Sequence, residues 1–489
     1  MTSPRPTGIV PVVLAAGLGT RMRSRTPKLL HAICGRPMLG YVLDASRAAT
    51  GERPLVVYSP ATAAIRDVFG SDVDFALQEE PRGTADAVRA ALARLPESVV
   101  EIVVLSGDVP LLDPELVVEL AAERRAAGAA MALVTVDTDD PDGLGRIIRD
   151  GDGGVEQVVE HKDATPGQRE VTEINAGIYA FDVAWLRDRL GDIAPSPVTG
   201  ELYLPALIEL ARADGRPVAA IEVEDDGSLG GINDRAQLAT AELDMRLRIN
   251  ERHMLAGVTM LDPTTTLVDA TVELAEDVIL EPMVALRGDT RIGRDTLVRQ
   301  GSQISDSAIG ERCVIWSSVI ESSVVEDGCR IGPFAHLRGG SHIGEGVELG
   351  NFAEVKKSRI GRGSKQHHFS YVGDAEVGEG VNIGAGTITA NFDGRAKHRT
   401  TIGDRAFIGS DTILRAPVTV GEGAYTGAGA VVTHDVPPGM VAVGVPARIR
   451  EKRPLSEPAA ETTTAAERTA PGESGAPDPR ATAGPPVRP

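Results

Sequence analysis

The feature that most constrains the fold of this chain is a six-residue repeat of aliphatic side chains in its second half. An aliphatic residue stands at every sixth position from Ile331 to Val355, and glycine directly follows three of the five. The interval returns from Ile402 to Val432, with one threonine among the aliphatics. Because this period fits neither a helix nor an alternating strand, it predicts a parallel β-helix of hexapeptide repeats, with aliphatics inside and glycines at tight corners. A right-handed solenoid or a β-sandwich is the alternative for this half.

The length and charge of the chain limit both its architecture and its partners. At 489 residues the chain exceeds one hydrophobic core, so we expect two or three domains. A formal net charge of -20 argues against a nucleic-acid partner, because phosphate backbones require basic surfaces. The three cysteines have no C-x-x-C spacing, which favours reduced thiols in a cytoplasmic protein. We find no signal peptide and no apolar run that could span a bilayer, and we expect no membrane insertion.

A glycine-rich turn near the start of the chain is suited to binding phosphate. The apolar run 9–14 leads into Ala-Ala-Gly-Leu-Gly-Thr-Arg-Met over 15–22, and Pro27-Lys28 follows. Glycines let backbone amides approach an anion, and Arg21 and Lys28 add positive charge. The turn is neither a Walker loop nor a G-x-G-x-x-G fingerprint, because the endings of both motifs are absent. It resembles the sugar-nucleotide pyrophosphorylases, whose signature is L-x-x-G-x-G-T-R-M followed by Pro-Lys.

Apolar runs alternate with helical stretches through the rest of the first half, which predicts a Rossmann-like α/β domain. Asp108 comes just after the buried strand predicted at 103–105, and ligands gather at the carboxyl ends of such strands. Asp108 is therefore placed to hold a metal, with a turn aspartate as the alternative. Asn233 stands at the predicted start of a helix, where an N-cap role is the local alternative.

The predicted domain boundaries follow changes in amino-acid composition and in the pattern of apolar residues. An amphipathic stretch joins the two halves without a flexible linker, and the last segment is rich in Ala, Pro, Thr and Glu with few large aliphatics. We expect a flexible N-terminus at 1–8, a nucleotidyltransferase domain at 9–233, a linker helix at 234–257, the β-helix domain at 258–453 and a disordered tail at 454–489.

Polar side chains interrupt the repeat in two strings, Lys-Gln-His-His-Phe-Ser-Tyr-Val-Gly-Asp over 365–374 and Val-Asn-Ile-Gly-Ala-Gly-Thr-Ile-Thr-Ala-Asn-Phe-Asp-Gly over 381–394. Singly, each polar residue is ordinary surface decoration. Together with the first half, they resemble the bacterial bifunctional family of N-acetylglucosamine-1-phosphate uridyltransferase and glucosamine-1-phosphate N-acetyltransferase. The resemblance covers residues 9 to about 450. It implies left-handed coils and a homotrimer whose acetyl sites are shared between chains.

The resemblance also implies two reactions. Acetyl moves from acetyl-CoA to glucosamine 1-phosphate, and the product, N-acetylglucosamine 1-phosphate, reacts with UTP to give UDP-N-acetylglucosamine and pyrophosphate. For the second reaction it implies Mg²⁺ on Asp108 and Asn233, with Arg21 and Lys28 as catalytic cations. The implied UTP and UDP-sugar contacts are Leu14, Ala15, Gly17, Lys28, Gln78, Gly83, Thr84, Gly145, Glu160, Asn175 and Asn233.

Acetyl transfer requires a base, because an ammonium ion has no lone pair with which to attack a thioester. An imidazole titrates near neutral pH, so His368 and its neighbour His367 are the candidates. Only His368 matches the family pattern His-x-[Ser/Thr]-Tyr. The implied glucosamine-phosphate contacts are Arg338, Lys356, Tyr371 and Asn382, with Lys397 as a further substrate contact. The implied acetyl-CoA contacts are Asn391, Phe392, Ser410 and Ala428.

Two departures from the family pattern leave other functions open. Phe392 stands where tyrosine is usual, and Gly339 follows Arg338 where proline is usual. One alternative is a single-function sugar-nucleotide pyrophosphorylase with a regulatory β-helix. Another is a trimeric scaffold whose acetyl site is inactive.

Overall fold

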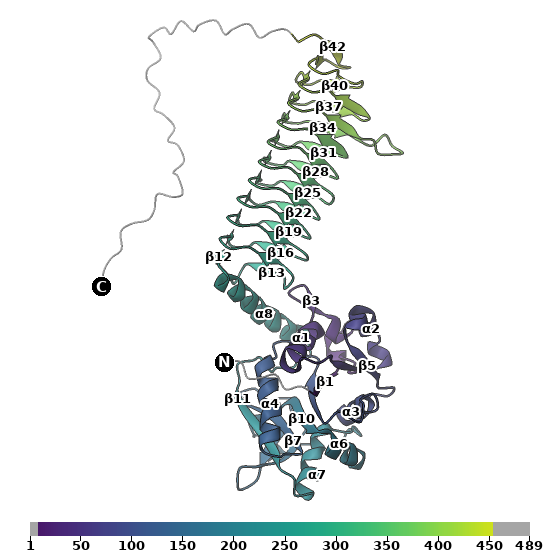
Figure 1. The fold of residues 1–489 in the computed structure, drawn as a ribbon, viewed down its shortest axis with the longest axis vertical. Helices are drawn as coiled ribbons and strands as arrows, with labels where there is room; N and C mark the ends of the chain where they lie inside the picture. The colour runs from purple at the N-terminus through teal and green to yellow at the C-terminus, as the bar shows by residue number, and fades with distance from the viewer. Residues whose placement is uncertain (1–7, 453–489) are drawn as a thin grey trace, which may run out of the picture.

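The structure, a computed structural model, describes residues 8–452. An α/β unit and a long β-helix are joined by one helix, α8 (Arg235–Leu255), as Figure 1 shows. The predicted disordered tail and all but the last residue of the predicted flexible N-terminus lie outside the described residues. The predicted fold class, an α/β nucleotidyltransferase-like domain followed by a parallel β-helix, is confirmed. Between residues 8 and 452, no helix is both long and apolar enough to cross a membrane.

The α/β unit is built on one mixed sheet of nine strands. Seven follow the order β11-β7-β10-β6-β1-β4-β5, and the β8-β9 ribbon attaches to β10. The strand β10 runs antiparallel to both neighbours, although the alternation of strands and helices is typical of a parallel sheet. The strands are β1 (Ile9–Leu14), β4 (Leu55–Tyr58), β5 (Asp74–Leu77), β6 (Glu101–Ser106), β7 (Met131–Asp137), β8 (Arg146–Arg149), β9 (Val155–Val159), β10 (Glu173–Asp182) and β11 (Val218–Glu224).

Helices cover both faces of this sheet, so its central strands are apolar on both sides. The adjacent residues Val12 and Val13 of β1 belong to different apolar clusters. The cluster with Val13 includes α1 (Met38–Thr50) and α4 (Pro114–Ala126). The cluster with Val12 includes α3 (Thr84–Leu92), α6 (Val183–Arg189) and α7 (Leu207–Ala213). The shorter helices are α2 (Ala64–Phe69) and α5 (Pro166–Arg169). Because helices cover both faces, only the ends of the strands remain uncovered by helices.

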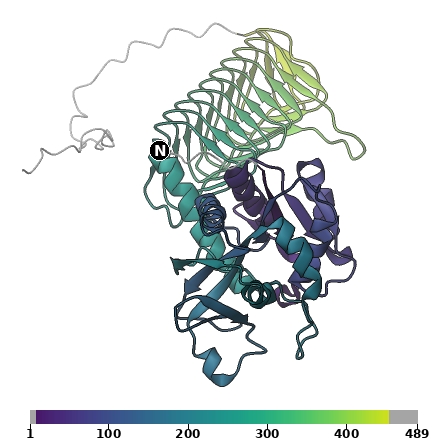
Figure 2. The same cartoon turned by 60° about the horizontal axis from the view of Figure 1, so that its bottom comes forward.

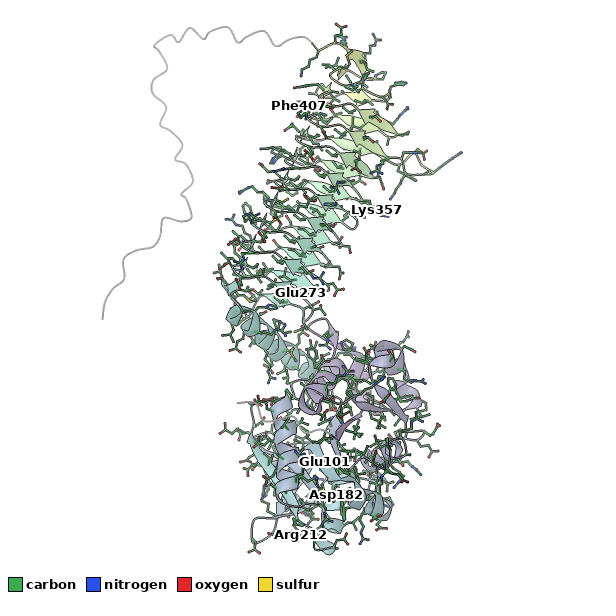
Figure 3. All side chains as sticks on the ribbon, in the orientation of Figure 1. Glu101, Asp182, Arg212, Glu273, Lys357 and Phe407 are labelled. Atoms are coloured by element: carbon green, nitrogen blue, oxygen red, sulfur yellow. The ribbon has the colours of Figure 1, made fainter. Side chains whose placement is uncertain are left out.

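The β-helix has three faces, and each face is a sheet that takes every third strand of the chain, except that the first face ends with β41 and the antiparallel β42. The first runs from β12 (Thr259–Met260) to β42 (Arg448–Arg450), the second from β13 (Leu267–Val268) to β40 (Val431–Val432), and the third from β14 (Glu273–Leu274) to β38 (Val418–Val420). Figure 2 shows the successive coils, and Figure 3 labels Glu273 near the start of the stack and Phe407 near its far end.

The six-residue repeat places one side chain of each strand inside the stack, and on most strands this side chain is aliphatic. Ile331 on β24 (Arg330–Ile331) pairs in register with Leu349 on β27 (Glu348–Leu349), and both are buried. Leu337 and Ile343 occupy the same inward position on the other two faces and are fully buried. Because neighbouring strands are parallel and in register, like side chains stack from coil to coil.

Helix α8 connects the two parts through a continuous apolar cluster. It lies in the region 234–257, and its buried residues include Met245 and Ile249. These two residues belong to one cluster with Leu39 of α1 and Val268 of β13. A hairpin of β2 (Ala32–Ile33) and β3 (Arg36–Pro37) extends from the α/β unit to the same junction. The two parts therefore share a core, which favours a fixed geometry between them.

We predict opposite outcomes for two adjacent valines of β23 (Val324–Val325). Val325 points inward and is 2% exposed, whereas Val324 points outward and is 44% exposed. Val325→Ala should lower the free energy of unfolding by about 2 kcal/mol, because it removes buried methyl groups and leaves a cavity. Val324→Ala should change it by less than about 0.5 kcal/mol. Urea unfolding followed by circular dichroism tests this, and equal effects would contradict the assignment of the inward face.

Candidate active sites

The loops that carry the first site leave the sheet at one edge. β1 and β6 are parallel neighbours with Leu14 opposite Ser106, so the segments that follow them emerge side by side. The Gly107 amide donates to the Leu14 carbonyl at 3.0 Å, which holds these segments together. Gly19 has φ +58°, and a Cβ there would lie 2.6 Å from the Cβ of Lys28. Only glycine at this position lets Lys28 pack against the turn.

Lys28, Asp108 and Asn233 meet at this edge, although they are far apart in the sequence. The Lys28 ammonium forms an ion pair with Asp108 and donates to Asn233 Oδ1 at 3.2 Å. The Ile232 amide donates to the Asp108 carbonyl at 3.0 Å and holds the two segments together. The N-cap of α8 is Asp234, which leaves the Asn233 side chain free for this contact. Three of the predicted site residues thus form one cluster.

The same cluster has the donor chemistry of a magnesium site. A carboxylate oxygen of Asp108 and the amide oxygen of Asn233 both contact one cationic group, the Lys28 ammonium. Magnesium prefers oxygen ligands, and in substrate-phosphate sites it is usually held by only one or two carboxylates while it keeps several waters. The predicted metal ligands therefore fit such an ion in type and in convergence. Arg21 lies nearby in sequence on the 3₁₀ turn η1 (Thr20–Met22) and is exposed.

The residues predicted for one wall of the first site lie in a rigid turn around Gln78. The buried Gln78 amide donates to the Gly83 carbonyl at 3.2 Å and to Asp86 at 3.0 Å. Gly83 has φ +122°, and a Cβ there would lie 2.4 Å from the Leu202 carbonyl oxygen. The Thr84 hydroxyl accepts a hydrogen bond of 2.9 Å from the backbone amide of Leu204. Gln78, Gly83 and Thr84 are therefore held together, and Asp86 supports Gln78 although the sequence analysis did not select it.

The residues predicted for the other wall, Gly145, Glu160 and Asn175, also lie close together. The backbone amide of Asn175 donates a hydrogen bond to the Gly145 carbonyl at 2.9 Å. A Cβ on Gly145 would lie 3.4 Å from Glu160 Oε1. The Asn175 side chain donates to the Tyr179 hydroxyl at 2.6 Å. Burial and the nearby Asp163 raise the pKa of Glu160. A carboxyl group in this environment is suited to hydrogen bonding with sugar hydroxyls.

The second candidate site is a cluster of cations on the β-helix. Arg338 on β25 (His336–Arg338) lies directly opposite Lys356 on β28 (Glu354–Lys356). The Lys397 side chain and the charge of Arg338 hold the pKa of Lys356 below its usual range. Arg338 also donates to Glu354 at 3.0 Å, which orients its guanidinium group. Three positive side chains gathered in this way are suited to bind a phosphate dianion.

Tyr371 and Asn391 extend this cluster. The Asn391 side chain donates to Asp374 and, at 3.4 Å, to the Tyr371 hydroxyl. The Asp374 amide donates to the Lys356 carbonyl at 3.0 Å. Asp374 was not selected from sequence, although it follows Tyr-Val-Gly in one of the two polar strings. It fixes the orientation of Asn391, which is itself buried.

His368 lies at a different corner of the coil. It stands two residues after β30 (Lys365–Gln366), is exposed and has φ +56°. Ser410 and Ala428 stand two residues after β36 (Phe407–Ile408) and β39 (Tyr425–Thr426), which belong to the same face. His368, Ser410 and Ala428 therefore follow one edge of the β-helix. His367 instead lies 3.6 Å from Glu348.

The residues predicted for the second site lie at two different corners of one chain. Among the described residues, no hydrogen bond joins His368 to the cation cluster of Arg338, Lys356 and Lys397. Asn382 lies on β33 (Asn382–Ile383), in the face that precedes the His368 corner. Phe392 is 60% exposed at the start of the loop between β34 (Ile388–Ala390) and β35 (Thr400–Ile402), which projects from the stack in Figure 1.

The His368 corner also contains a break in the repeat that the sequence analysis missed. Gln366 occupies an inward position where most other coils carry an aliphatic residue, and it is fully buried. Its amide donates at 3.4 Å to the carbonyls of Glu354 and Ser370. Through Ser370 this side chain links the two ends of the corner that presents His368, and through Glu354 it links the corner to the preceding coil. The signal was available in the sequence, since glutamine interrupts an otherwise aliphatic position.

The two halves match different protein families. Residues 11–226 match the MobA-like NTP transferase domain, and residues 322–357 and 399–434 match the six-repeat bacterial transferase hexapeptide. The chain is 44% identical over 477 residues to the bifunctional protein GlmU of Mycobacterium bovis, covering 95% of this chain and 96% of the relative. It is 45% identical over 460 residues to the protein of that name in Kineococcus radiotolerans, covering 92% and 93%. The corresponding values for Mycobacterium avium are 44% over 486 residues, with 96% and 99% covered.

We predict that the cation cluster of Arg338, Lys356 and Lys397 binds inorganic phosphate. Lys356→Gln should weaken binding about tenfold, because one charged contact is lost. Since the pKa of Lys356 is lowered, affinity in the unsubstituted protein should fall as pH rises through that pKa and Lys356 loses its charge. Calorimetric titration measures both effects. Lys365→Gln is the control, because Lys365 pairs with Glu348 at 3.0 Å on another face. Equal losses in both variants would contradict the assignment.

Proposed function

The chain belongs to the family of bifunctional GlmU proteins, as its resemblance predicted, and we propose from this premise how its two halves make UDP-N-acetylglucosamine. The β-helix half acetylates glucosamine 1-phosphate with acetyl-CoA. The α/β half transfers UMP from UTP to the N-acetylglucosamine 1-phosphate and releases pyrophosphate. The observation that carries the proposal is the presence of two separate clusters of charged side chains, one in which Lys28 meets Asp108 and Asn233, and one in which Lys356 meets Arg338 and Lys397.

In uridyl transfer, a phosphate oxygen of the sugar phosphate attacks the α-phosphorus of UTP, and pyrophosphate leaves. The attacking phosphate is already an anion at neutral pH, so no general base is required. Catalysis therefore rests on alignment and on neutralising charge. Lys28 and Arg21 would stabilise the triphosphate as negative charge builds on the departing pyrophosphate. The glycine turn that holds Lys28 would present its backbone amides to the same group.

Asp108 and Asn233 would hold Mg²⁺ in this half. When bound, the ion would supply charge neutralisation to the phosphate oxygens. The convergence of both oxygens on the Lys28 ammonium supports this assignment. Lys28 contacts both of the proposed ligands, so its charge is already positioned beside the metal site.

The two walls of the first site would select the two substrates. Gln78, Gly83 and Thr84 would contact the uracil ring. The hydrogen bond from Gln78 to Gly83 and the one from the Leu204 backbone amide to Thr84 support a fixed recognition surface. Gly145, Glu160 and Asn175 would contact the sugar. Leu14, Ala15 and Gly17 line the start of the glycine turn, where the nucleotide would pass between the walls. The hydrogen bond between Asn175 and Gly145 favours a preformed sugar pocket.

In acetyl transfer, the amine of glucosamine 1-phosphate attacks the thioester carbonyl. His368 would take the amine proton, an amide bond forms, the carbon–sulfur bond breaks, and the CoA sulfur leaves with a proton returned from His368. Arg338, Lys356 and Lys397 would hold the sugar phosphate, with Tyr371 and Asn382 against the sugar. Asn391, Phe392, Ser410 and Ala428 would contact acetyl-CoA along the edge that His368 shares.

We further propose a homotrimer. In one chain the proposed acetyl-transfer residues lie at separate corners, and an apolar surface is left exposed to solvent. Phe334 and Phe352 are 57% and 59% exposed, and their rings stack with centroids 5.4 Å apart. They lie at the same corner as His368, on the two preceding coils. A neighbouring chain at this corner would cover the rings and bring its own residues to His368. The buried free cysteines support a cytoplasmic location.

The two reactions should be separable by single substitutions. Asp108→Ala should abolish uridyl transfer and leave acetyl transfer near its starting rate. His368→Ala should lower acetyl transfer by about 10²-fold to 10⁴-fold, because a positioned base is lost, and should spare uridyl transfer. His367→Ala is the matched control and should have little effect on either rate. Pyrophosphate release and thioester consumption are measured on the same preparation. If Asp108→Ala stopped both reactions in a folded protein, the assignment of separate roles would be wrong.

The trimer should depend on the phenylalanine pair. Phe352→Ser should dissociate the assembly, because a fully apolar contact becomes polar at the proposed interface. Light scattering should change from three times the 51.3 kDa chain mass to that mass itself. Val324→Ser, on another face, should keep the larger mass. A monomer in the unsubstituted protein would exclude the proposed assembly.

A further inference from the structure

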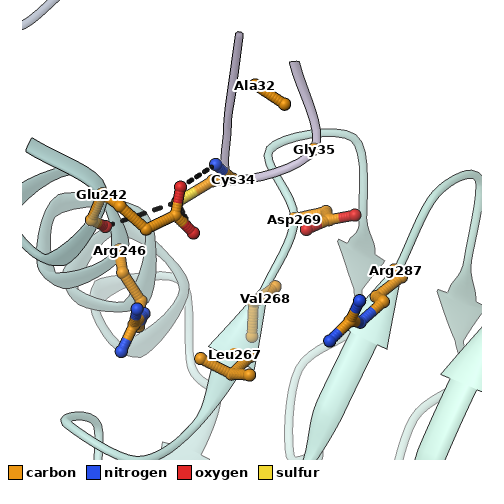
Figure 4. Close-up of a pocket in the computed structure, with 9 residues that line it drawn as sticks. All are labelled: Ala32, Cys34, Gly35, Glu242, Arg246, Leu267, Val268, Asp269 and Arg287. Carbon is orange, nitrogen blue, oxygen red and sulfur yellow. Dashed lines mark hydrogen bonds between the residues drawn. The ribbon is translucent and has the colours of Figure 1, made fainter. Parts of the chain in front are cut away.

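A cavity of about 310 Å³ lies where the α/β unit, α8 and the first coils meet. The tip of the β2-β3 hairpin contributes Cys34, α8 contributes Glu242 and Arg246, and the coils contribute Asp269 and Arg287, as Figure 4 shows. This cavity is separate from the cluster of Lys28 and from that of Lys356. Its volume is at the small end of the range for ligand pockets, roughly 300 to 1,000 Å³, and suits a monosaccharide derivative.

Four charged side chains line the cavity without pairing with one another. Each carboxylate already accepts one hydrogen bond from a backbone amide. Glu242 accepts it from Cys34 at 2.7 Å, and Asp269 accepts it from Gly288 at 3.0 Å. Arg246 donates to the Thr264 carbonyl at 3.3 Å, and its buried Nε has no partner. Between residues 8 and 452, none of the four takes part in a salt bridge. The cavity therefore offers two guanidinium groups and two carboxylates with unused hydrogen-bonding capacity.

The cysteine in the cavity is not suited to covalent chemistry. Burial and the neighbouring Glu242 raise the pKa of the Cys34 thiol to about 12, so the reactive thiolate is scarce at neutral pH. The thiol also lies 3.7 Å from the Glu242 carbonyl oxygen. A ligand here would be held by noncovalent contacts.

We propose that this cavity is a binding site for a small phosphorylated sugar, distinct from both active sites. The planar forks of Arg246 and Arg287 match a phosphate group, which two guanidinium groups recognise through paired hydrogen bonds. Glu242 and Asp269 require donors, which the hydroxyls of a sugar supply. A polycarboxylate would bring further negative charge against them. The combination therefore selects an anion that also carries hydroxyls.

The position of the cavity connects it to uridyl transfer. The 3₁₀ turn η2 (Lys28–Leu30) carries Lys28, and one residue separates it from β2 of the hairpin. The hairpin tip packs closely on the cavity wall, because a Cβ on Gly35 would lie 2.5 Å from the Asp269 carboxylate. The Ala270 amide also donates to the Cys34 carbonyl at 2.9 Å. A ligand that links the hairpin to α8 and β16 (Ala285–Arg287) restrains the segment that positions Lys28.

Binding is tested on the full-length protein with glucose 6-phosphate as the probe, in the absence of other substrates. Glucose 6-phosphate should raise the thermal unfolding midpoint, because a ligand that binds only the folded state stabilises it. Arg287→Gln should remove that shift. Arg291→Gln is the matched control and should retain it, because Arg291 lies outside the cavity and pairs with Glu273 at 3.0 Å. Glucose and inorganic phosphate, each lacking one recognised part, should give smaller shifts.

Kinetic coupling gives the second measurement. Glucose 6-phosphate should lower the KM for UTP by about fivefold, within the usual range of coupling between sites, and should leave acetyl transfer unchanged. Arg287→Gln should lose this response. Phosphate and sugar phosphates can also bind the cluster of Arg338, Lys356 and Lys397, so the site is judged by the part of the thermal shift that Arg287→Gln removes. The site is excluded if no thermal shift occurs, if Arg287→Gln retains the whole shift, or if that variant removes as much of the shift with phosphate alone as with the sugar phosphate. A shift without a change in KM would support the site and overturn its link to Lys28. Because the thermal measurement needs no turnover, its result is independent of the proposed enzymatic function.

Discussion

The second half of the molecule depends on the inward position of each hexad, which has room for an aliphatic side chain and no water to solvate a polar one. Ile331, Leu337 and Ile343 satisfy this constraint on three successive faces. Because the constraint fixes one residue in six, the outward and corner positions are free to carry polar chemistry. Gln366 is a polar exception. Its hydrogen bond to the Ser370 carbonyl joins the two ends of the corner that presents His368, and its hydrogen bond to the Glu354 carbonyl connects this corner to the preceding coil. The stack thus provides a rigid frame on which few positions determine function.

The first half obtains its site from a different constraint, the parallel pairing of β1 with β6. That pairing brings the loops after both strands to one edge and places Lys28 against Asp108. Asn233 joins them immediately before α8, the helix whose other end packs on the first coils of the β-helix. The start of this helix therefore adjoins the cluster proposed for uridyl transfer, and its other end fixes the position of the domain that carries the cluster proposed for acetyl transfer. The continuous apolar cluster through Met245 and Ile249 gives this connection its stiffness.

The features that depend on the spacing of residues close together in the sequence were predicted best. The six-residue period indicated the β-helix, and the buried strand before Asp108 indicated its place at the sheet edge. The sequence did not indicate that β10 runs antiparallel, because alternating apolar runs do not encode strand direction. The roles of Asp86 and Asp374 also escaped prediction. Each acts by orienting another side chain, Gln78 or Asn391, and such contacts arise only when separate segments pack together. Asn233 was selected by resemblance, since a helix start alone favours an N-cap.

The central claim, that one chain performs acetylation and then uridyl transfer, is tested most directly by ³¹P NMR of a single reaction mixture. The mixture contains the purified protein, glucosamine 1-phosphate, acetyl-CoA, UTP and Mg²⁺. The account predicts that N-acetylglucosamine 1-phosphate appears first, followed by UDP-N-acetylglucosamine and pyrophosphate in equal amounts. Without acetyl-CoA, little UDP-sugar should form. Rapid formation of a UDP-sugar in the absence of acetyl-CoA, or failure to form the acetylated intermediate, would contradict the account.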